Sequence, residues 1–181
     1  SGPVTAEHRE IQVWIDRLPD TTRFLLVAQA LEAYHSRSTH FVSCVQPAPE
    51  FRRRRATILS SIQDSAEKQW LKEKLQHANQ KTLAQRLNDI IARHHCEAPH
   101  FIPSAARFAD KVRYTRNYYT HFDDSLRTQG KIAEGRDLFL ITTQARTLLK
   151  IAFLSDLGFP ESVIHRAALG MRDLDLIALE P

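Results

Sequence analysis

Glycine is the feature that most limits the folds open to this chain. The 181 residues contain only five glycines, and after Gly2 the next one is Gly130. A Walker A loop and a dinucleotide-binding fingerprint both need closely spaced glycines, because their backbone must approach phosphate groups. The scarcity of glycine therefore excludes both motifs. It also leaves few positions suited to positive φ, as expected of a mainly helical chain.

Apolar residues recur with helical spacing in almost every long stretch, and no alternating strand pattern is visible. We expect helices over residues 7–17, from Thr21 or Thr22 to about Arg37, over 52–62, from Asp64 or Ser65 onward, over 82–95, from Ser104 to about Leu126, over 137–157, and between Pro160 and Gly170. The segments 47–49 and 99–103 are predicted to be irregular loops, because each contains two prolines. Residues expected in the core include Trp14, Trp70, Leu71 and Leu75. The predicted fold class is an all-α helical bundle with mostly short connections.

Composition is ordinary for one soluble globular domain, with 43% hydrophobic and 25% charged residues. The net charge of +4 permits a polyanionic partner without requiring one. Two cysteines, Cys44 and Cys96, cannot form a disulfide framework, so we expect a cytoplasmic protein with reduced thiols. No apolar run approaches the length of a membrane span, and no membrane association is predicted. Residues 1–20 are expected to hold an expression-tag scar and a short leading helix, and residues 21–181 a single domain.

The segment Arg116-Asn117-Tyr118-Tyr119-Thr120-His121 groups side chains able to perform chemistry within about one and a half helical turns. A histidine can take and return a proton near neutral pH. An arginine can bind a phosphate bidentately, and an asparagine can orient a neighbouring group. Together they could cleave RNA without a metal, with histidine acting on the 2′-hydroxyl or the leaving oxygen. From these residues alone, a solvated polar helix face is the commoner explanation.

A helical wheel of residues 104–126 predicts two faces. The polar face holds Asp110, Arg113, Tyr114, Asn117, Thr120, His121 and Asp124. The apolar face holds Phe108, Val112, Tyr119, Phe122 and Leu126. Arg116 lies at the margin of the polar face, and Tyr118 lies between the two faces. We therefore expect Tyr119 in the core and Tyr118 at a dimer contact or in a substrate groove.

The segment from Arg116 to His121 resembles the R-x4-H signature of HEPN domains, including the frequent asparagine after the arginine. The earlier segment FLLVAQALEAYHSR, residues 24–37, resembles the first core helix of the ApeA-like HEPN group. The resemblance implies a HEPN-type bundle of four to five helices, here with additional helices. It also implies a homodimer in which two motif helices meet near the two-fold axis.

For function, the resemblance implies a cofactor-free, metal-independent endoribonuclease of the toxin, abortive-infection or anti-phage defence type. Arg116 and His121 match the catalytic pair, and Asn117 matches the accompanying polar position. ApeA-like proteins carry this domain at the C-terminal end, so we expect a longer protein. A regulatory N-terminal domain or an antitoxin is then a further partner to consider.

Two alternatives stay open within the same family. The first is a HEPN module without catalysis that only dimerises or senses a ligand. The second is a toxin silenced by nucleotidyl transfer to a tyrosine beside the motif, for which Tyr118 or Tyr114 would be the acceptor.

Polar residues outside the motif could support it. Gln29, Glu32 and His35 lie three apart and form a narrow polar stripe on their predicted helix. Glu32 is predicted to orient His121 or to pair with Arg116; the alternative is an exposed helix edge.

Basic residues supply candidate RNA contacts. Arg52, Arg53, Arg54 and Arg55 form the strongest local charge run, and with Arg113 they are predicted to contact the phosphate backbone. The alternative for the run is a solvated loop and helix start. The group His94, His95, Cys96 and His100 fits no standard zinc spacing, so no metal site is predicted.

Overall fold

The computed structural model describes residues 18–177 of the chain, with side chains described as far as residue 170. Over that range the secondary structure is helical, with no strand, which confirms the all-α class. The expected helix over 7–17 and Trp14 lie outside the described residues.

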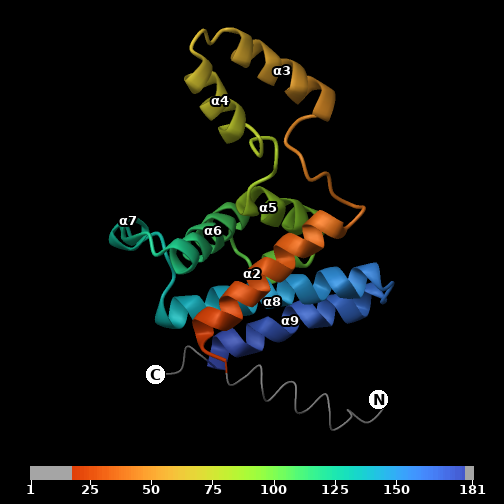
Figure 1. Ribbon diagram of the computed structural model, residues 1–181. Helices are drawn as coiled ribbons and strands as arrows, with labels where there is room; N and C mark the ends of the chain where they lie inside the picture. Colours follow the sequence, from red (N-terminus) through yellow and green to blue (C-terminus); the bar gives the residue numbers. More distant parts are fainter. Residues whose placement is uncertain (1–17, 178–181) are drawn as a thin grey trace.

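The described helices follow one another with mostly short connections. In chain order they are α2 (Asp20–Arg37), α3 (Ala48–Ser60), α4 (Ser65–Lys74), α5 (Leu83–Arg93), the 3-10 turn η1 (Ala98–His100), α6 (Ala105–His121), α7 (Asp124–Thr128), α8 (Gly135–Asp156) and α9 (Glu161–Ile177). Helix α2 packs along α8, α8 packs along α9, and α5 packs against α6 (Figure 1). These five helices form the bundle, which therefore brings the motif helix α6 against α2 and α5.

The bundle core is built from one apolar face of each of its helices. The largest fully buried apolar side chains are Phe24, Leu31, Leu87, Ile90, Val112, Leu148 and Ile151. Burial of each such side chain contributes about 1.5–3 kcal/mol. The helical spacing predicted for α5 is confirmed, since Leu83, Leu87, Ile90 and Ile91 are all buried.

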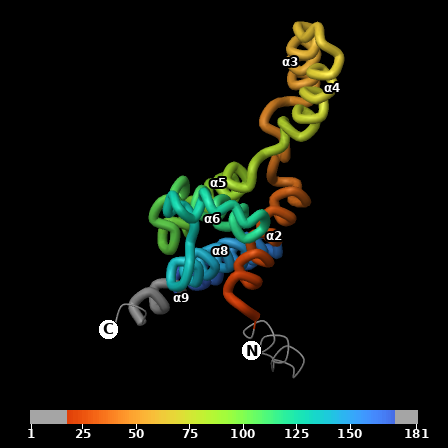
Figure 2. The backbone as a smooth tube through the Cα atoms, turned by 60° about the vertical axis from the view of Figure 1, so that its left-hand side comes forward, coloured from red at the N-terminus to blue at the C-terminus, as the bar shows by residue number. Residues whose placement is uncertain are grey.

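Helices α3 and α4 form a hairpin that projects from the bundle, as Figures 1 and 2 both show. Neither helix contains a buried residue, because two short helices alone cannot enclose a side chain. The side chain of Trp70 is 60% exposed, so the expectation that it belongs to the core is wrong. Leu71 and Leu75, also expected in the core, are only half-buried.

The two segments that connect the hairpin to the bundle are joined by hydrogen bonds at the base of the hairpin. The side chain of Asn79 accepts a hydrogen bond from the Gln46 amide and donates one to the Gln46 carbonyl, each 2.9 Å long. The Val45 amide donates to the Asn79 carbonyl at 2.8 Å, and Lys81 N donates to the Ser43 carbonyl at 3.0 Å. The hairpin therefore has a defined base although its helices bury nothing.

Three helices begin close to their predicted starts, and the predicted cap at Ser104 is confirmed. Asp64 caps α4, Thr82 and Gln85 form a capping box on α5, and Ser104 caps α6. Helix α2 differs, because it begins at Asp20 rather than being capped by Thr21 or Thr22.

The first proline segment also differs from its predicted loop structure. Helix α3 begins at Ala48, so Pro49 lies in its first turn. A proline is tolerated there because the first turn does not need its missing N–H group.

The motif helix ends earlier than predicted. It stops at His121 because Phe122 adopts left-handed backbone geometry with φ 52°, and Asp123 then caps the separate helix α7. Phe122 is consequently 73% exposed, and the predicted apolar face does not continue to Leu126. Asp124 likewise leaves the polar face of the motif helix and begins α7.

Helix α8 is the only helix of the described residues that length and composition would allow to cross a bilayer. The expectation that no run approaches that length is therefore wrong for α8. Its buried residues pack within the bundle against α2 and α9, while Arg146 and Lys150 are exposed in its middle. This arrangement is that of a core helix.

Candidate functional site

The guanidinium of Arg116 extends from α6 toward α2. Its Nη2 atom lies 3.4 Å from Oε2 of Glu32, with 29% of the Arg116 side chain and 37% of the Glu32 side chain exposed. One of the two predicted roles of Glu32, pairing with Arg116, is therefore present in the structure. For the other role, no hydrogen bond or ion pair joins Glu32 to His121 within the described part of the chain.

A surface cavity of about 310 Å³ lies beside this ion pair. It is lined by Leu25, Gln29, Glu32, Arg116 and Thr120. The Thr120 hydroxyl donates to the Arg116 carbonyl at 2.7 Å, so it is engaged within its own helix. Arg116 is the only cation among these lining residues, which makes it the group that an incoming phosphate would meet.

His121 is the last residue of α6, and its side chain is exposed. No described residue forms a hydrogen bond or ion pair with its imidazole, so both ring nitrogens can reach an added ligand. Phe122, the next residue, is also exposed, and its amide donates to the Tyr118 carbonyl at 2.6 Å. The early end of α6 therefore places a proton-transfer group and an apolar ring together at the surface.

Asn117 is half-buried one helical turn before His121, and no described group forms a hydrogen bond with its side chain. Its amide is thus available to orient a neighbouring group. Arg113 is less available, because its Nη2 lies 3.0 Å from Asp110 Oδ1 and its guanidinium carbon lies 4.1 Å from the Tyr114 ring centre.

The tyrosines differ from the wheel prediction. Tyr118 is 8% exposed and belongs to the buried residues, whereas Tyr119 is half-buried with its ring centre 6.4 Å from that of Phe24. The wheel correctly turns Tyr119 toward the core but underestimates the burial of Tyr118. Tyr114 is half-buried and is the more accessible of the two predicted nucleotidyl acceptors.

The arginine run does not join the motif. Arg52, Arg53 and Arg54 are exposed on α3, in the hairpin that projects from the bundle (Figure 1). Arg55 is half-buried, and its Nη2 donates to the Lys72 carbonyl at 3.1 Å, linking α3 to α4. The structure therefore separates the arginine run from the predicted catalytic pair, whereas Arg113 lies on the same helix as the pair.

His35 is not part of the polar stripe expected with Gln29 and Glu32. It is 1% exposed, its ring stacks on Phe41 at 4.6 Å between centres, and its Nε2 lies 2.7 Å from Asp89 Oδ2. Burial is the main cause that lowers its pKa. The spacing of His35 four residues after the core residue Leu31 could have indicated this burial.

The histidines and the cysteine considered for zinc do not form a cluster. His94 is buried, His95 and Cys96 are exposed, and the His100 ring packs against His165 at 5.0 Å between centres. Across residues 18–170, no three His, Cys, Asp or Glu side chains come close enough together to hold a metal ion.

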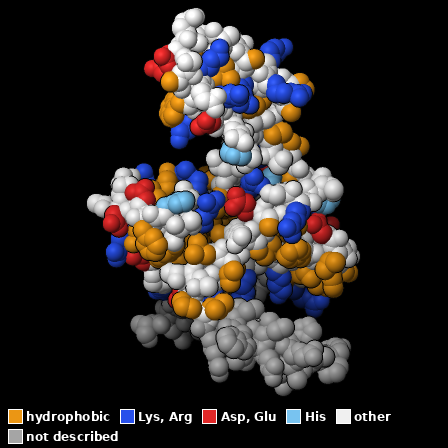
Figure 3. All heavy atoms as spheres, in the orientation of Figure 1, with side chains coloured by type: hydrophobic (Ala, Val, Ile, Leu, Met, Phe, Trp, Pro, Cys, Tyr) orange, Lys and Arg blue, Asp and Glu red, His pale blue; other side chains and the backbone are white. Residues whose placement is uncertain are grey.

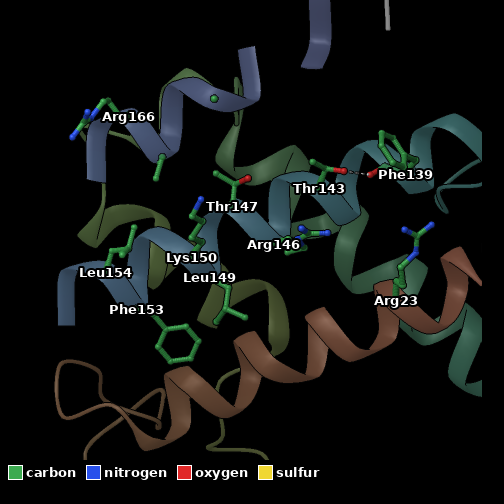
Figure 4. Close-up of a pocket in the computed structure, with 12 residues that line it drawn as sticks. Arg23, Phe139, Thr143, Arg146, Thr147, Leu149, Lys150, Phe153, Leu154 and Arg166 are labelled. Atoms are coloured by element: carbon green, nitrogen blue, oxygen red, sulfur yellow. Dashed lines mark hydrogen bonds between the residues drawn. The ribbon is translucent and has the colours of Figure 1, made fainter. Parts of the chain in front are cut away.

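Sequence reasoning missed a larger basic groove of about 750 Å³. Figure 4 shows four cationic side chains around it: Arg23 from α2, Arg146 and Lys150 from α8, and Arg166 from α9. Arg146 and Lys150 lie four residues apart, a spacing that could have indicated a shared helix face. The described residues that line this groove include no histidine and no carboxylate, so the groove offers no such group for proton transfer.

Comparison with known proteins identifies one family. A family model described as Apea-like HEPN matches residues 25–163, well over half of the chain. The matched range includes Glu32 and the whole segment from Arg116 to His121. No curated protein and no solved structure matches the chain.

Proposed function

Because the chain belongs to the ApeA-like HEPN family, whose wider class consists generally of ribonuclease and defence modules, we propose that it is a metal-independent endoribonuclease domain of a defence system. The observation that carries the proposal is the end of α6. There, exposed His121 follows Arg116, whose guanidinium lines a surface cavity. A proton-transfer group and a phosphate-binding group thus occur within one and a half turns of one helix.

In the proposed reaction, His121 accepts the proton of an RNA 2′-hydroxyl as its oxygen attacks the adjacent phosphorus. The bond from phosphorus to the 5′-oxygen breaks, and an imidazolium returns a proton to that leaving oxygen. Arg116 stabilises the negative charge that develops on the phosphoryl oxygens. The products are a 2′,3′-cyclic phosphate and a 5′-hydroxyl, and Asn117 orients the reacting groups.

Glu32 is proposed to position Arg116 until RNA arrives. A half-exposed ion pair of this kind contributes only about 0.2–1 kcal/mol, so it can orient the guanidinium without holding it irreversibly. An RNA phosphate then replaces the carboxylate as the partner of Arg116. Glu32 is a positioning residue in this scheme, because it acts through Arg116.

Dimerisation is proposed to complete the site, since HEPN domains generally dimerise. Phe122 is 73% exposed beside His121, and burying its ring between two copies would remove apolar surface from water. Such a contact would bring the two α6 ends together, so that one His121 acts as base and the other as acid. A strict monomer in light scattering would contradict this composite site.

The decisive experiment is cleavage of labelled RNA by the purified chain in EDTA. His121→Ala should reduce the rate by at least about 100-fold, the lower range for loss of a proton-transfer group. Arg116→Ala should reduce it by about 100- to 1,000-fold, the range for loss of a group that stabilises developing negative charge. Exposed residues away from the site provide matched controls, His95→Ala for the histidine and Arg107→Ala for the arginine, and both should cleave normally.

Two results would contradict the proposal. Cleavage that persists in both His121→Ala and Arg116→Ala would refute the assignment of the site. Loss of cleavage in EDTA would refute the metal-independent mechanism.

A further inference from the structure

The hairpin of α3 and α4, residues 48–75, carries most of the excess positive charge of the protein. It contains seven Lys and Arg residues against four Asp and Glu residues, a net charge of +3 beside +4 for the whole chain. Figure 3 shows Lys and Arg side chains spread over the visible face of this projecting lobe, with hydrophobic side chains between them. The hairpin is therefore a basic projection on a bundle that is close to neutral.

The charges of the hairpin, unlike those near the motif, are not neutralised within the protein. Near the motif, Arg116 pairs with Glu32, Arg113 pairs with Asp110, and Arg127 pairs with Glu134 at 3.1 Å. None of the seven hairpin cations forms an ion pair with a carboxylate of the described residues; one of them, Arg55, donates to a backbone carbonyl. Uncompensated positive charge on a projecting element attracts polyanions and raises their rate of association.

An exposed tryptophan lies beside one of these cations. Trp70 on α4 is 60% exposed, and Lys74 Nζ lies 5.9 Å from the centre of its ring. A surface cavity of about 590 Å³ adjoins the indole and is lined by Ile62, Ala66, Glu67, Trp70 and Leu71. Since α3 and α4 bury no residue, the ring is not needed as a core side chain of the hairpin.

We propose that the α3–α4 hairpin is a binding arm for single-stranded RNA, whose bases stack on Trp70. One or two of Arg52, Arg53 and Arg54 contact the phosphates of the same strand, because successive residues of a helix point about 100° apart. The proposal rests on the ribonuclease function proposed above and specifies the form of RNA that the protein captures. Aromatic rings combined with a basic surface are the general means of binding single strands, because every base presents a flat face.

The chemistry of the arm favours a single-stranded nucleic acid over a duplex and over a protein partner. In a duplex the base faces are covered by stacking, so a single projecting ring cannot reach them. A protein interface built around Trp70 would bury a surface rich in lysine, a residue depleted at interface cores.

The test measures binding without cleavage, using His121→Ala as the parent. Fluorescence anisotropy is recorded with a labelled 12-nucleotide single-stranded RNA and with a 12-base-pair duplex. Adding Trp70→Ala should weaken single-strand binding roughly 5- to 150-fold, the range for loss of one base–aromatic stack. Trp70→Phe should restore most of the affinity, and Phe139→Ala, which removes an exposed ring from α8, should leave binding unchanged.

Salt dependence tests the arginines separately. The combined change Arg52→Gln, Arg53→Gln and Arg54→Gln should reduce the slope of log affinity against log salt by about 0.7–1.4, since each of one or two single-strand phosphate contacts contributes about 0.7. Circular dichroism should show unchanged helix content in each variant, because the substituted side chains are exposed.

Three outcomes would overturn the arm: no single-strand binding by the parent, equal binding of the duplex, or unchanged binding by Trp70→Ala. A change of molar mass on Trp70→Ala would instead identify the hairpin as a protein interface. The nuclease proposal is judged independently. If cleavage depends on His121 but Trp70→Ala binds RNA normally, the nuclease proposal stands and the binding arm is rejected. If binding depends on Trp70 but the unsubstituted chain does not cleave RNA, the binding arm stands and the nuclease proposal is rejected.

Discussion

Replacing Thr115 with valine should test how the motif helix is anchored to the bundle. Thr115 is 0% exposed in the middle of α6, and its hydroxyl oxygen accepts a hydrogen bond of 2.9 Å from the Ala133 amide. Ala133 is also 0% exposed and lies just before α8. Valine has nearly the shape of threonine but no acceptor, so Thr115→Val leaves the Ala133 N–H buried without a partner.

The expected loss of unfolding free energy follows from that unsatisfied N–H donor. A buried amide that loses its acceptor costs about 1–3 kcal/mol of unfolding free energy. The exchange of a hydroxyl for a methyl group leaves almost no cavity, so the transfer and cavity contributions stay small by comparison. For a domain of this length, each kcal/mol lowers the melting temperature by about 2–4 °C, so the expected decrease is roughly 2–12 °C.

Urea denaturation followed by circular dichroism at one protein concentration provides the measurement. The midpoint should fall while the slope m stays constant, because the exposed surface does not change. Thr143→Val is the matched control, since the half-exposed Thr143 hydroxyl donates only to the Phe139 carbonyl of its own helix at 2.9 Å. The unfolding free energy of Thr143→Val should stay within about 0.5 kcal/mol of that of the unsubstituted protein. Equal losses in both variants, or no loss in Thr115→Val, would refute the reasoning.

Two further predictions concern the end of α6 and the buried histidines. Phe122→Gly should weaken the proposed dimer in sedimentation. It should also raise the unfolding free energy of the protomer by about 1 kcal/mol, because the roughly 1–2 kcal/mol cost of a non-glycine residue at φ 52° exceeds the entropic cost of ordering a glycine; a destabilised protomer would contradict it. Burial is the main cause that lowers the pKa of His35 and of His94, so the unfolded chain binds more protons below the ordinary pKa of about 6.5. The contribution of these histidines to stability should therefore be complete above that pH and decrease as pH falls toward their folded pKa values; urea midpoints that stay level from pH 7 to pH 5.5 would be inconsistent with it.

Local features of this protein were predictable from sequence because helical spacing and capping depend on neighbouring residues. The buried positions of α5 and the caps at Asp64, Thr82 and Ser104 follow from patterns only a few residues long. The burial of His35 in α2 was harder to predict, because histidine is a polar residue. Its position one helical turn after the core residue Leu31 was the only local sign of burial.

The candidate site was predictable in part. The segment from Arg116 to His121 identifies the residue types and places them on one helix. The wheel could not find the end of that helix, because an aromatic residue with φ 52° at Phe122 is rare and has no sequence signal comparable to glycine. Its consequence reaches the candidate site, since the early end leaves both His121 and Phe122 exposed.

By itself, the sequence determined the all-α class, the residues that could perform the chemistry and the helix that carries them, because these depend on composition and on contacts within one helix. Only the tertiary structure decided that Glu32 pairs with Arg116, since that contact joins residues 84 positions apart on two packed helices. It also decided that Trp70 and the arginine run lie on a projecting hairpin. Whether an apolar residue is buried depends on what packs against its helix, and no neighbouring residue in the sequence specifies that.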